Sequence, residues 1–314
     1  MDEVIHEERR NDSNNDLHRS TEYWYSDGNV VLVASNGVAY RVHTSRLSQH
    51  SSLFRGMLTL PRPDTEELLE ACPVVRLHDP ESDLYAFLTH IYMAHRVYAI
   101  GGSFGVRHLG LMLRISDKYQ ADSIYEEAKY QLQRLFPDDI SEWNLSQNTD
   151  ALSDPGALFT LANVLKSQEH QGDIHAKYLP RVLYLCAQLH AENLVCGAYQ
   201  PSSETPETLD PELLIRCLTA QRTLMAAGIK MYSLMNTLGK PEDHRFRSFR
   251  MNKLASVLPG SDVTTLVLTA SPAYDKDGRV LEQLRIGLED YWPQYQDLLR
   301  QKRQEILTNL EQYV

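Results

Sequence analysis

The chain has 314 residues, of which 42% are hydrophobic and 23% are charged, a composition typical of soluble globular proteins with a buried core. Its formal net charge of −11 opposes binding to nucleic acid or to an anionic membrane surface. No apolar run reaches the roughly eighteen residues of a membrane-spanning helix, and the polar N-terminus lacks the chemistry of a signal peptide. We therefore expect two soluble domains, located in the cytoplasm, the nucleus or both.

The four cysteines, Cys72, Cys186, Cys196 and Cys217, are scattered along the chain. A disulfide framework would show a dense and regular set instead. Their spacing favours reduced thiols in a reducing compartment.

The first ordered element is expected at Tyr23. Residues 1–22 are mostly acidic and polar, and such a segment buries too little apolar surface to order itself, which predicts a disordered tail. The β-branched run 29–34, the turn signal Ser35-Asn36-Gly37 and the run 38–42 then predict a β-hairpin.

Two short helices are expected after the hairpin, at 45–49 and 51–60. Three apolar residues of the second helix share one face at helical spacing: Leu53, Phe54 and Met57. A loop over 61–70 and a third short strand over 73–77 follow.

Asp79-Pro80-Glu81 predicts the start of the next helix, with Asp79 as its N-cap and proline at the first helical position. Two amphipathic helices follow, at 104–119 and 121–136, and Pro137 ends the second. A small sheet covered by helices is an α+β domain, which we place at 23–137.

The second half has a different pattern. An acidic and polar linker at 138–156 leads to a region in which almost every periodic segment is helical, and we expect an all-α domain at 155–314. The predicted helices are 157–168, 178–194, 211–237, 245–257 and 280–312. Asp210-Pro211-Glu212 repeats the helix start seen at Asp79, and residues 200–208 are expected to form a surface loop.

The first half also carries a set of short motifs. They are Trp24, Asp27-Gly28-Asn29-Val30-Val31-Leu32, Tyr40-Arg41-Val42-His43, Ser51-Ser52-Leu53-Phe54-Arg55-Gly56-Met57, Cys72-Pro73-Val74-Val75-Arg76-Leu77-His78-Asp79 and Phe136-Pro137-Asp138-Asp139-Ile140-Ser141-Glu142-Trp143. With this combination, residues 23–143 resemble the BTB/POZ domain, in the version common in fungal proteins. The second half is similar to the helical tails of those proteins. The resemblance implies an α+β interaction domain that is often dimeric and sometimes an adaptor for cullin-type ubiquitin ligases.

The resemblance also implies roles for single residues. Asp27 and His43 belong to the structural motif, with His43 half-buried and hydrogen-bonded at a strand end. Cullin binders often carry a hydrophobic residue, any residue and then glutamate after the second short helix, and Leu68-Leu69-Glu70 fits this short pattern. Leu68 and Glu70 are therefore the cullin-facing candidates, with packing support from Leu53, Phe54 and Met57.

Two features depart from the BTB/POZ pattern. Relatives that repress transcription form a charged pocket from an acid and a base, and the corresponding positions here hold Asn29 and Thr44, so we expect that pocket to be absent or different. Those relatives also dimerise by exchanging an N-terminal strand, and residues 6–22 are too polar to supply one.

Residues that suggest catalysis or ligand binding each have a structural explanation as well. Cys186 and His190 are four residues apart on a predicted helix, near Cys196, but a structural zinc site needs four ligands and the surrounding leucines favour core packing. Residues 101–105 are glycine-rich but lack the Lys-Ser/Thr of a phosphate-binding loop. The basic cluster 244–253 fits either an acidic or phosphorylated partner or a solvated helix face.

These patterns predict a non-catalytic protein-interaction module without a cofactor, a BTB-type adaptor or scaffold. Its expected partners are other proteins, with a second copy of the chain and a cullin scaffold among them, and neither nucleic acid nor membrane. Two alternatives stay open. One is a self-associating scaffold or transcriptional co-regulator that binds no ligase. The other is an enzyme with a site around Cys186 and His190, which requires an accessible, activated Cys186 thiol.

Overall fold

The computed structural model describes residues 17–60, 67–99, 105–137, 154–168, 173–199 and 206–238, together with 297, 301, 304–306, 308–312 and 314. At 94–99, 173, 225 and 227–238 it describes the backbone alone. The chain divides into two compact units, Met1–Leu132 and Gln133–Val314. None of the described helices is long and apolar enough to cross a membrane.

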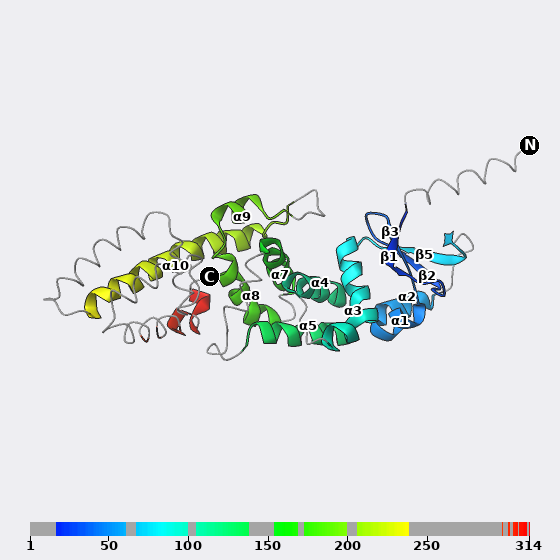
Figure 1. Cartoon of the computed structure of the whole chain (residues 1–314), viewed down its shortest axis with the longest axis horizontal. Coiled ribbons are helices and arrows are strands. Elements are labelled where there is room, and N and C mark those ends of the chain that lie inside the picture. The colour runs from blue at the N-terminus through cyan, green and yellow to red at the C-terminus, as the bar shows by residue number, and fades with distance from the viewer. Residues whose placement is uncertain are drawn as a thin grey trace, which may run out of the picture. The chain divides into compact units, whose positions relative to one another are not determined.

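The N-terminal unit contains a five-stranded mixed sheet with the strand order β1-β3-β2-β5-β4 (Figure 1). The strands are β1 His18–Trp24, β2 Val30–Val33, β3 Val38–Val42, β4 Leu68–Leu69 and β5 Cys72–Arg76. The antiparallel pairing of β2 with β3 across Gly37, whose φ is 85°, confirms the predicted hairpin. β5 runs parallel to β2, and β1 runs parallel to β3.

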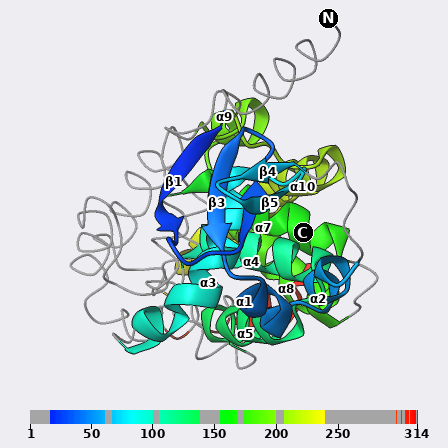
Figure 2. The same cartoon turned by 90° about the vertical axis from the view of Figure 1, so that its right-hand side faces the viewer.

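The strand β1 corrects the expected tail and lies at the edge of the sheet beside β3 (Figure 2). Residues 18–22, predicted to be disordered and too polar for a strand, belong to it. Edge strands often carry charged and polar side chains because these oppose pairing with another chain, so composition underestimates such strands. Its pairing is interrupted, since the register shifts between Arg19 and Trp24. Residues 1–16 lie outside the described part.

Five helices belong wholly or mainly to this unit: α1 Thr44–His50, α2 Ser52–Leu58, α3 Glu81–Ala99, α4 Val106–Lys118 and α5 Asp122–Leu135. All four residues of β2 are buried, and because strand side chains alternate between faces, both faces of the sheet are covered there. Leu17, Trp24, Leu69 and Val74 pack against one of these faces. A sheet with helices packed against it confirms the α+β class of this unit.

Two buried acids join the start of α3 to α4. Asp83 forms a bidentate ion pair with Arg114, with N···O distances of 2.7 and 2.6 Å. Asp79 accepts from Lys118 Nζ at 2.6 Å and from the Tyr119 hydroxyl, so its carboxylate is used for long-range contacts and not as the predicted cap of α3. A buried carboxylate without such partners is strongly destabilising.

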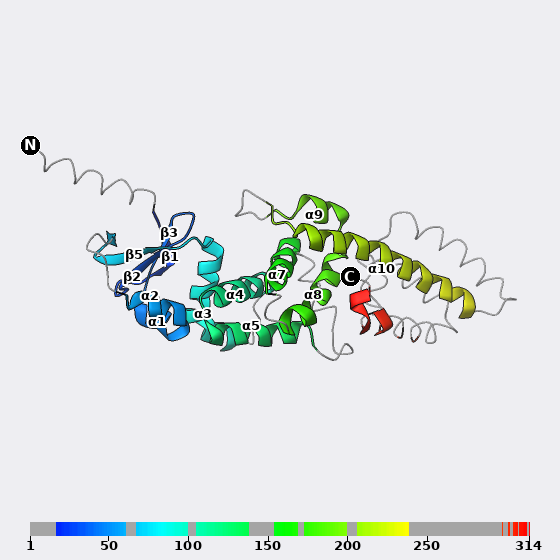
Figure 3. The same cartoon turned by 180° about the vertical axis from the view of Figure 1, so that it is seen from behind.

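The Gln133–Val314 unit is helical throughout its described regular part, with one isolated β-bridge between Ala198 and Glu207. Its helices are α7 Pro155–Ser167, α8 Asp173–Cys186, α9 Ala191–Cys196, α10 Pro211–Leu238 and the 3-10 turn η6 Leu310–Gln312. Figure 3 shows α9 alongside the first part of α10, and the two helices are in contact. The predicted helices 157–168 and 211–237 are confirmed within a few residues.

The predicted helix 178–194 is wrong, because α8 starts earlier, at Asp173, and ends at Cys186, while α9 begins only at Ala191. A turn separates the two helices, with backbone hydrogen bonds from Gln188 N to Leu185 O and from Leu189 N to Cys186 O. The apolar spacing continues through this break, so periodicity alone does not reveal it. The expectations at 245–257 lie outside the described residues, and 280–312 is described only in part.

The predicted surface loop at 200–208 is closed at its base. Ala198 and Glu207 exchange backbone hydrogen bonds of 2.8 and 2.9 Å. Gly197 has φ +81°, and a Cβ there would lie 2.7 Å from Glu207 O, so only glycine fits. Thr160 of α7 holds the Glu207 carboxylate at 2.7 Å, which fixes the C-terminal end of the loop to a helix.

Arg114→Leu is expected to lower the free energy of unfolding by about 3 kcal/mol, because Asp83 is left buried without its main partner. Urea unfolding followed by circular dichroism measures the loss. Lys129→Leu is the matched control, since Lys129 pairs with Glu126 on an exposed face of α5 and such pairs contribute about 0.5 kcal/mol. Equal losses in the two variants would contradict the assigned role of Asp83.

Gly197→Ala is expected to cost about 1 to 3 kcal/mol, because it combines a left-handed φ with a steric overlap. The same urea titration checks it. Gly56→Ala is the control: a Cβ at Gly56 in α2 meets nothing within 4 Å, so there the exchange should add about 0.5 to 1 kcal/mol to helix stability. A neutral Gly197→Ala would mean that the loop base is not rigid.

Candidate protein-interaction surface

The apolar face expected on α2 is divided between the core and the surface. Phe54 is buried and stacks on Tyr119 at 4.5 Å and on Phe87 at 5.9 Å between ring centroids. Leu53 is 41% exposed, and Met57 is half-buried. Phe54 therefore supports the fold, whereas Leu53 and Met57 are the ones that a partner can reach. The packing support expected of these three residues for an interface stays a prediction, with Phe54 acting from the core.

Leu68 and Glu70 lie on a hairpin and not in the loop that the sequence predicted. Leu68 is in β4 and is 54% exposed. Leu69 pairs with Cys72, which leaves Glu70 and Ala71 as the two turn residues, with φ of 50° and 62°. A type I′ turn needs positive φ at both positions, and residues other than glycine adopt it at a cost of about 1 to 2 kcal/mol each.

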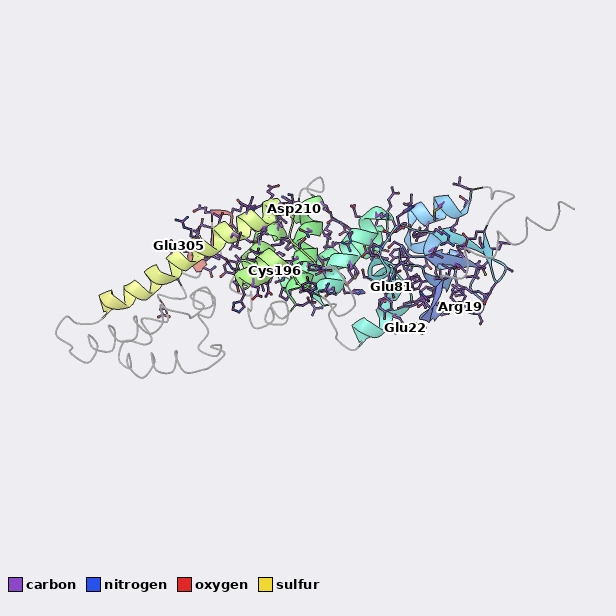
Figure 4. The ribbon with its side chains drawn as sticks, turned by 90° about the horizontal axis from the view of Figure 1, so that it is seen from above. Arg19, Glu22, Glu81, Cys196, Asp210 and Glu305 are labelled. Atoms are coloured by element: carbon purple, nitrogen blue, oxygen red, sulfur yellow. The ribbon has the colours of Figure 1, made fainter. Side chains whose placement is uncertain are left out.

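Two arginines hold the Glu70 carboxylate. Arg19 Nη2 lies 2.6 Å from one oxygen and Arg41 Nη1 lies 3.0 Å from the other. Arg41 also donates from Nε to Gly28 O at 2.9 Å. Figure 4 labels Arg19 on β1, the edge strand. Glu70 is therefore a partly exposed acid with both oxygens already paired.

Sequence reasoning missed both of these arginines. Arg41 carried a signal, because it stands inside the otherwise apolar strand β3, where a charged residue needs an acidic partner. Arg19 carried no signal, since it lies within the segment that composition assigned to a disordered tail.

Asp27 and His43 are brought together. His43 Nε2 lies 3.2 Å from Asp27 Oδ1, and His43 Nδ1 lies 2.9 Å from the Tyr92 hydroxyl. Tyr92 also accepts from the His43 backbone N–H at 3.1 Å. Burial raises the pKa of Tyr92, so its phenol stays protonated and is not an activated nucleophile. The arrangement favours a structural role that fixes the start of α1.

Asn29 and Thr44, the positions of the charged pocket in the repressor relatives, are also neighbours. Asn29 Nδ2 donates to Thr44 Oγ1 at 3.1 Å, and Thr44 N donates to Asn29 Oδ1 at 2.8 Å. The pair is neutral, and the Asn29 side-chain amide and the Thr44 backbone N–H both bond within it. An acidic or basic side chain of another protein would gain no ion pair from these two residues.

The candidates in the helical unit are not brought together. Cys186 is fully buried, and burial together with the neighbouring Cys217 thiol raises its pKa well above the usual range. His190 and Cys196 are exposed. A nucleophilic cysteine needs a thiolate and access to solvent, and Cys186 has neither.

Metal binding gains no support from the part of the chain that the structure describes, where no group of three or more His, Cys, Asp or Glu side chains gathers. The glycine-rich segment is described only at Gly105, which precedes α4. The basic cluster at 244–253 lies outside the described residues, so its two interpretations stay predictions.

Comparison with family models, with curated proteins and with solved structures finds no match to this chain in any of the three.

The cysteines offer a direct test of the site around Cys186. In the native chain, a thiol reagent should modify one of the four cysteines rapidly, because Cys196 alone is exposed while Cys72, Cys186 and Cys217 are buried. Cys196→Ser should remove the rapid phase, and all remaining thiols should react in urea. A rapid phase that survives Cys196→Ser and disappears when Cys186→Ser is added would restore Cys186 as a candidate nucleophile.

Proposed function

We propose that the chain is a non-catalytic protein-interaction module whose N-terminal unit is a BTB/POZ-type domain acting as an adaptor or scaffold. The observation that carries the proposal is the outward position of Leu53 and Leu68, two large apolar side chains next to motifs that the resemblance singles out. Exposed leucines, one of them two residues from a paired acid, are compatible with a surface that buries apolar groups against another protein. The order of hairpin, two short helices, strand and helices is compatible with the resemblance.

The adaptor form of the proposal names a cullin scaffold as the partner. Leu68 would supply the apolar contact and Glu70 the charge, with Leu53 and Met57 of α2 adding apolar surface. The helical unit would hold a second protein, so that the chain joins two partners. Partners of this kind place the chain in the cytoplasm or the nucleus.

The alternative proposal is a self-associating scaffold or transcriptional co-regulator that binds no ligase. It draws on the same exposed leucines, which a second copy of the chain can cover as well as a cullin can. The neutral pair Asn29–Thr44 argues against a partner that reads a charged pocket at these positions. The enzyme alternative loses its proposed residue, because Cys186 is buried and its pKa is raised.

A calorimetric titration with the N-terminal part of a fungal cullin scaffold of the BTB-binding kind tests the adaptor form. Binding at micromolar affinity, about −8 kcal/mol, is expected for the unmodified chain. Leu68→Asp should weaken it at least about tenfold, since it places a charge in the buried contact. Ile215→Asp is the matched control, because Ile215 on α10 is an aliphatic residue at least as exposed, at 66% against 54% for Leu68.

Absence of binding by a well-folded chain would overturn the adaptor form, and so would equal effects of Leu68→Asp and Ile215→Asp. Light scattering on the same preparation then decides the alternative. A stable oligomer that Leu53→Asp or Leu68→Asp dissociates supports the scaffold, whereas a monomer excludes it at that concentration.

A further inference from the structure

Arg19 lies between an aromatic ring and a carboxylate. Its guanidinium carbon is 4.8 Å from the centroid of the Trp24 ring, and its Nη2 is 2.6 Å from Glu70 Oε1. A ring face and a carboxylate are the two groups that bind guanidinium best, the first by cation–π attraction and the second by charge-assisted hydrogen bonds.

The two arginines on Glu70 differ in how firmly they are held. Arg41 is 17% exposed and is fixed by the carbonyl of Gly28, where a Cβ would lie 2.9 Å from the Arg41 side chain. Arg19 is 55% exposed and binds the other carboxylate oxygen. Arg41 therefore holds Glu70 in position, and Arg19 occupies its outer side.

Arg19 can leave this position at small cost. Its contacts to Glu70 and Trp24 are partly solvated, and exposed pairs of either kind contribute about 1 kcal/mol or less. Its side chain can rotate into solvent while its backbone stays paired with Ala39 of β3. Trp24 and Glu70 are held independently, Trp24 by packing against the sheet and Glu70 by Arg41.

We propose that Trp24 and Glu70 form an arginine-binding site that Arg19 fills in the isolated chain and that an arginine of a partner protein takes over. The fitting partner segment carries an exposed arginine close to an apolar residue, because exposed Leu68 lies two residues before Glu70. The inference goes beyond the proposed function, since it holds for any protein partner with this chemistry and does not require a cullin.

The test uses the full chain and a small probe, Nα-acetyl-arginine methylamide, followed through the indole N–H signal of Trp24 in NMR spectra. The chain has three tryptophans, and Trp24→Phe assigns the signal. Arg19→Ser removes the internal competitor, so the probe should bind this variant about fivefold more tightly than the unmodified chain, the factor that corresponds to about 1 kcal/mol.

Two controls define the chemistry. The citrulline analogue of the probe has the same shape without the charge and should not shift the Trp24 signal. Arg19→Ser combined with Glu70→Gln should lose the gain, because the ring alone binds guanidinium weakly. Arg19→Gln repeats the comparison with a longer polar side chain if Arg19→Ser disturbs β1, which the dispersion of the amide signals shows.

The proposal is overturned if folded Arg19→Ser and unmodified chain bind the probe equally, or if the citrulline analogue shifts Trp24 to the same extent. Neither result depends on a cullin. A chain that binds the probe only after Arg19 is removed supports the site even where the cullin titration fails. If the cullin binds but Arg19→Ser does not change probe binding, the adaptor proposal stands without the arginine-binding site.

Discussion

The Arg41 side chain links three parts of the N-terminal sheet that are distant in sequence. From β3 it donates to the carbonyl of Gly28, just before β2, and to the carboxylate of Glu70 in the β4–β5 turn. The Cys72 thiol, at the start of β5, donates to the same Gly28 carbonyl at 3.2 Å. These bonds join the β2–β3 hairpin to the β4–β5 turn, and the Arg19–Glu70 pair adds β1 to them.

This arrangement explains several features of the sequence at once. Gly28 has no room for a side chain because the Arg41 stem passes over it. Glu70 and Ala71 adopt left-handed backbone angles without glycine, and the two arginines on Glu70 help to offset the cost of that turn. The exposed surface that we propose for partner binding therefore depends on an ion pair that also shapes the backbone.

Much of the fold could be predicted because it follows from local patterns. The hairpin at 30–42, the two short helices and the long helix α10 all have spacing that a short window reveals. The two Asp-Pro-Glu triplets show where such reasoning ends. Asp210 accepts from Glu212 N at 2.9 Å and caps its helix as predicted, whereas Lys118 and Tyr119 draw the Asp79 side chain into a buried network.

The candidate site was harder to predict for the same reason. Periodicity places Leu53, Phe54 and Met57 on one broad face of a helix of two turns, but Tyr119 and Phe87 decide which of them is buried. The exposed state of Leu68 follows from its position in a short edge strand, and the partners of Glu70 come from strands that are 29 and 51 residues earlier in the chain. No local window contains both halves of these contacts.

The closed base of the loop between α9 and α10 has a consequence for engineering the chain. The two ends of this loop are joined by their own backbone bridge between Ala198 and Glu207, and the second end is tied to α7. Lengthening a connection costs little when its ends are already fixed near each other. A reporter peptide or an affinity tag inserted between these two residues would thus be attached to the helical unit without changing the packing of its core.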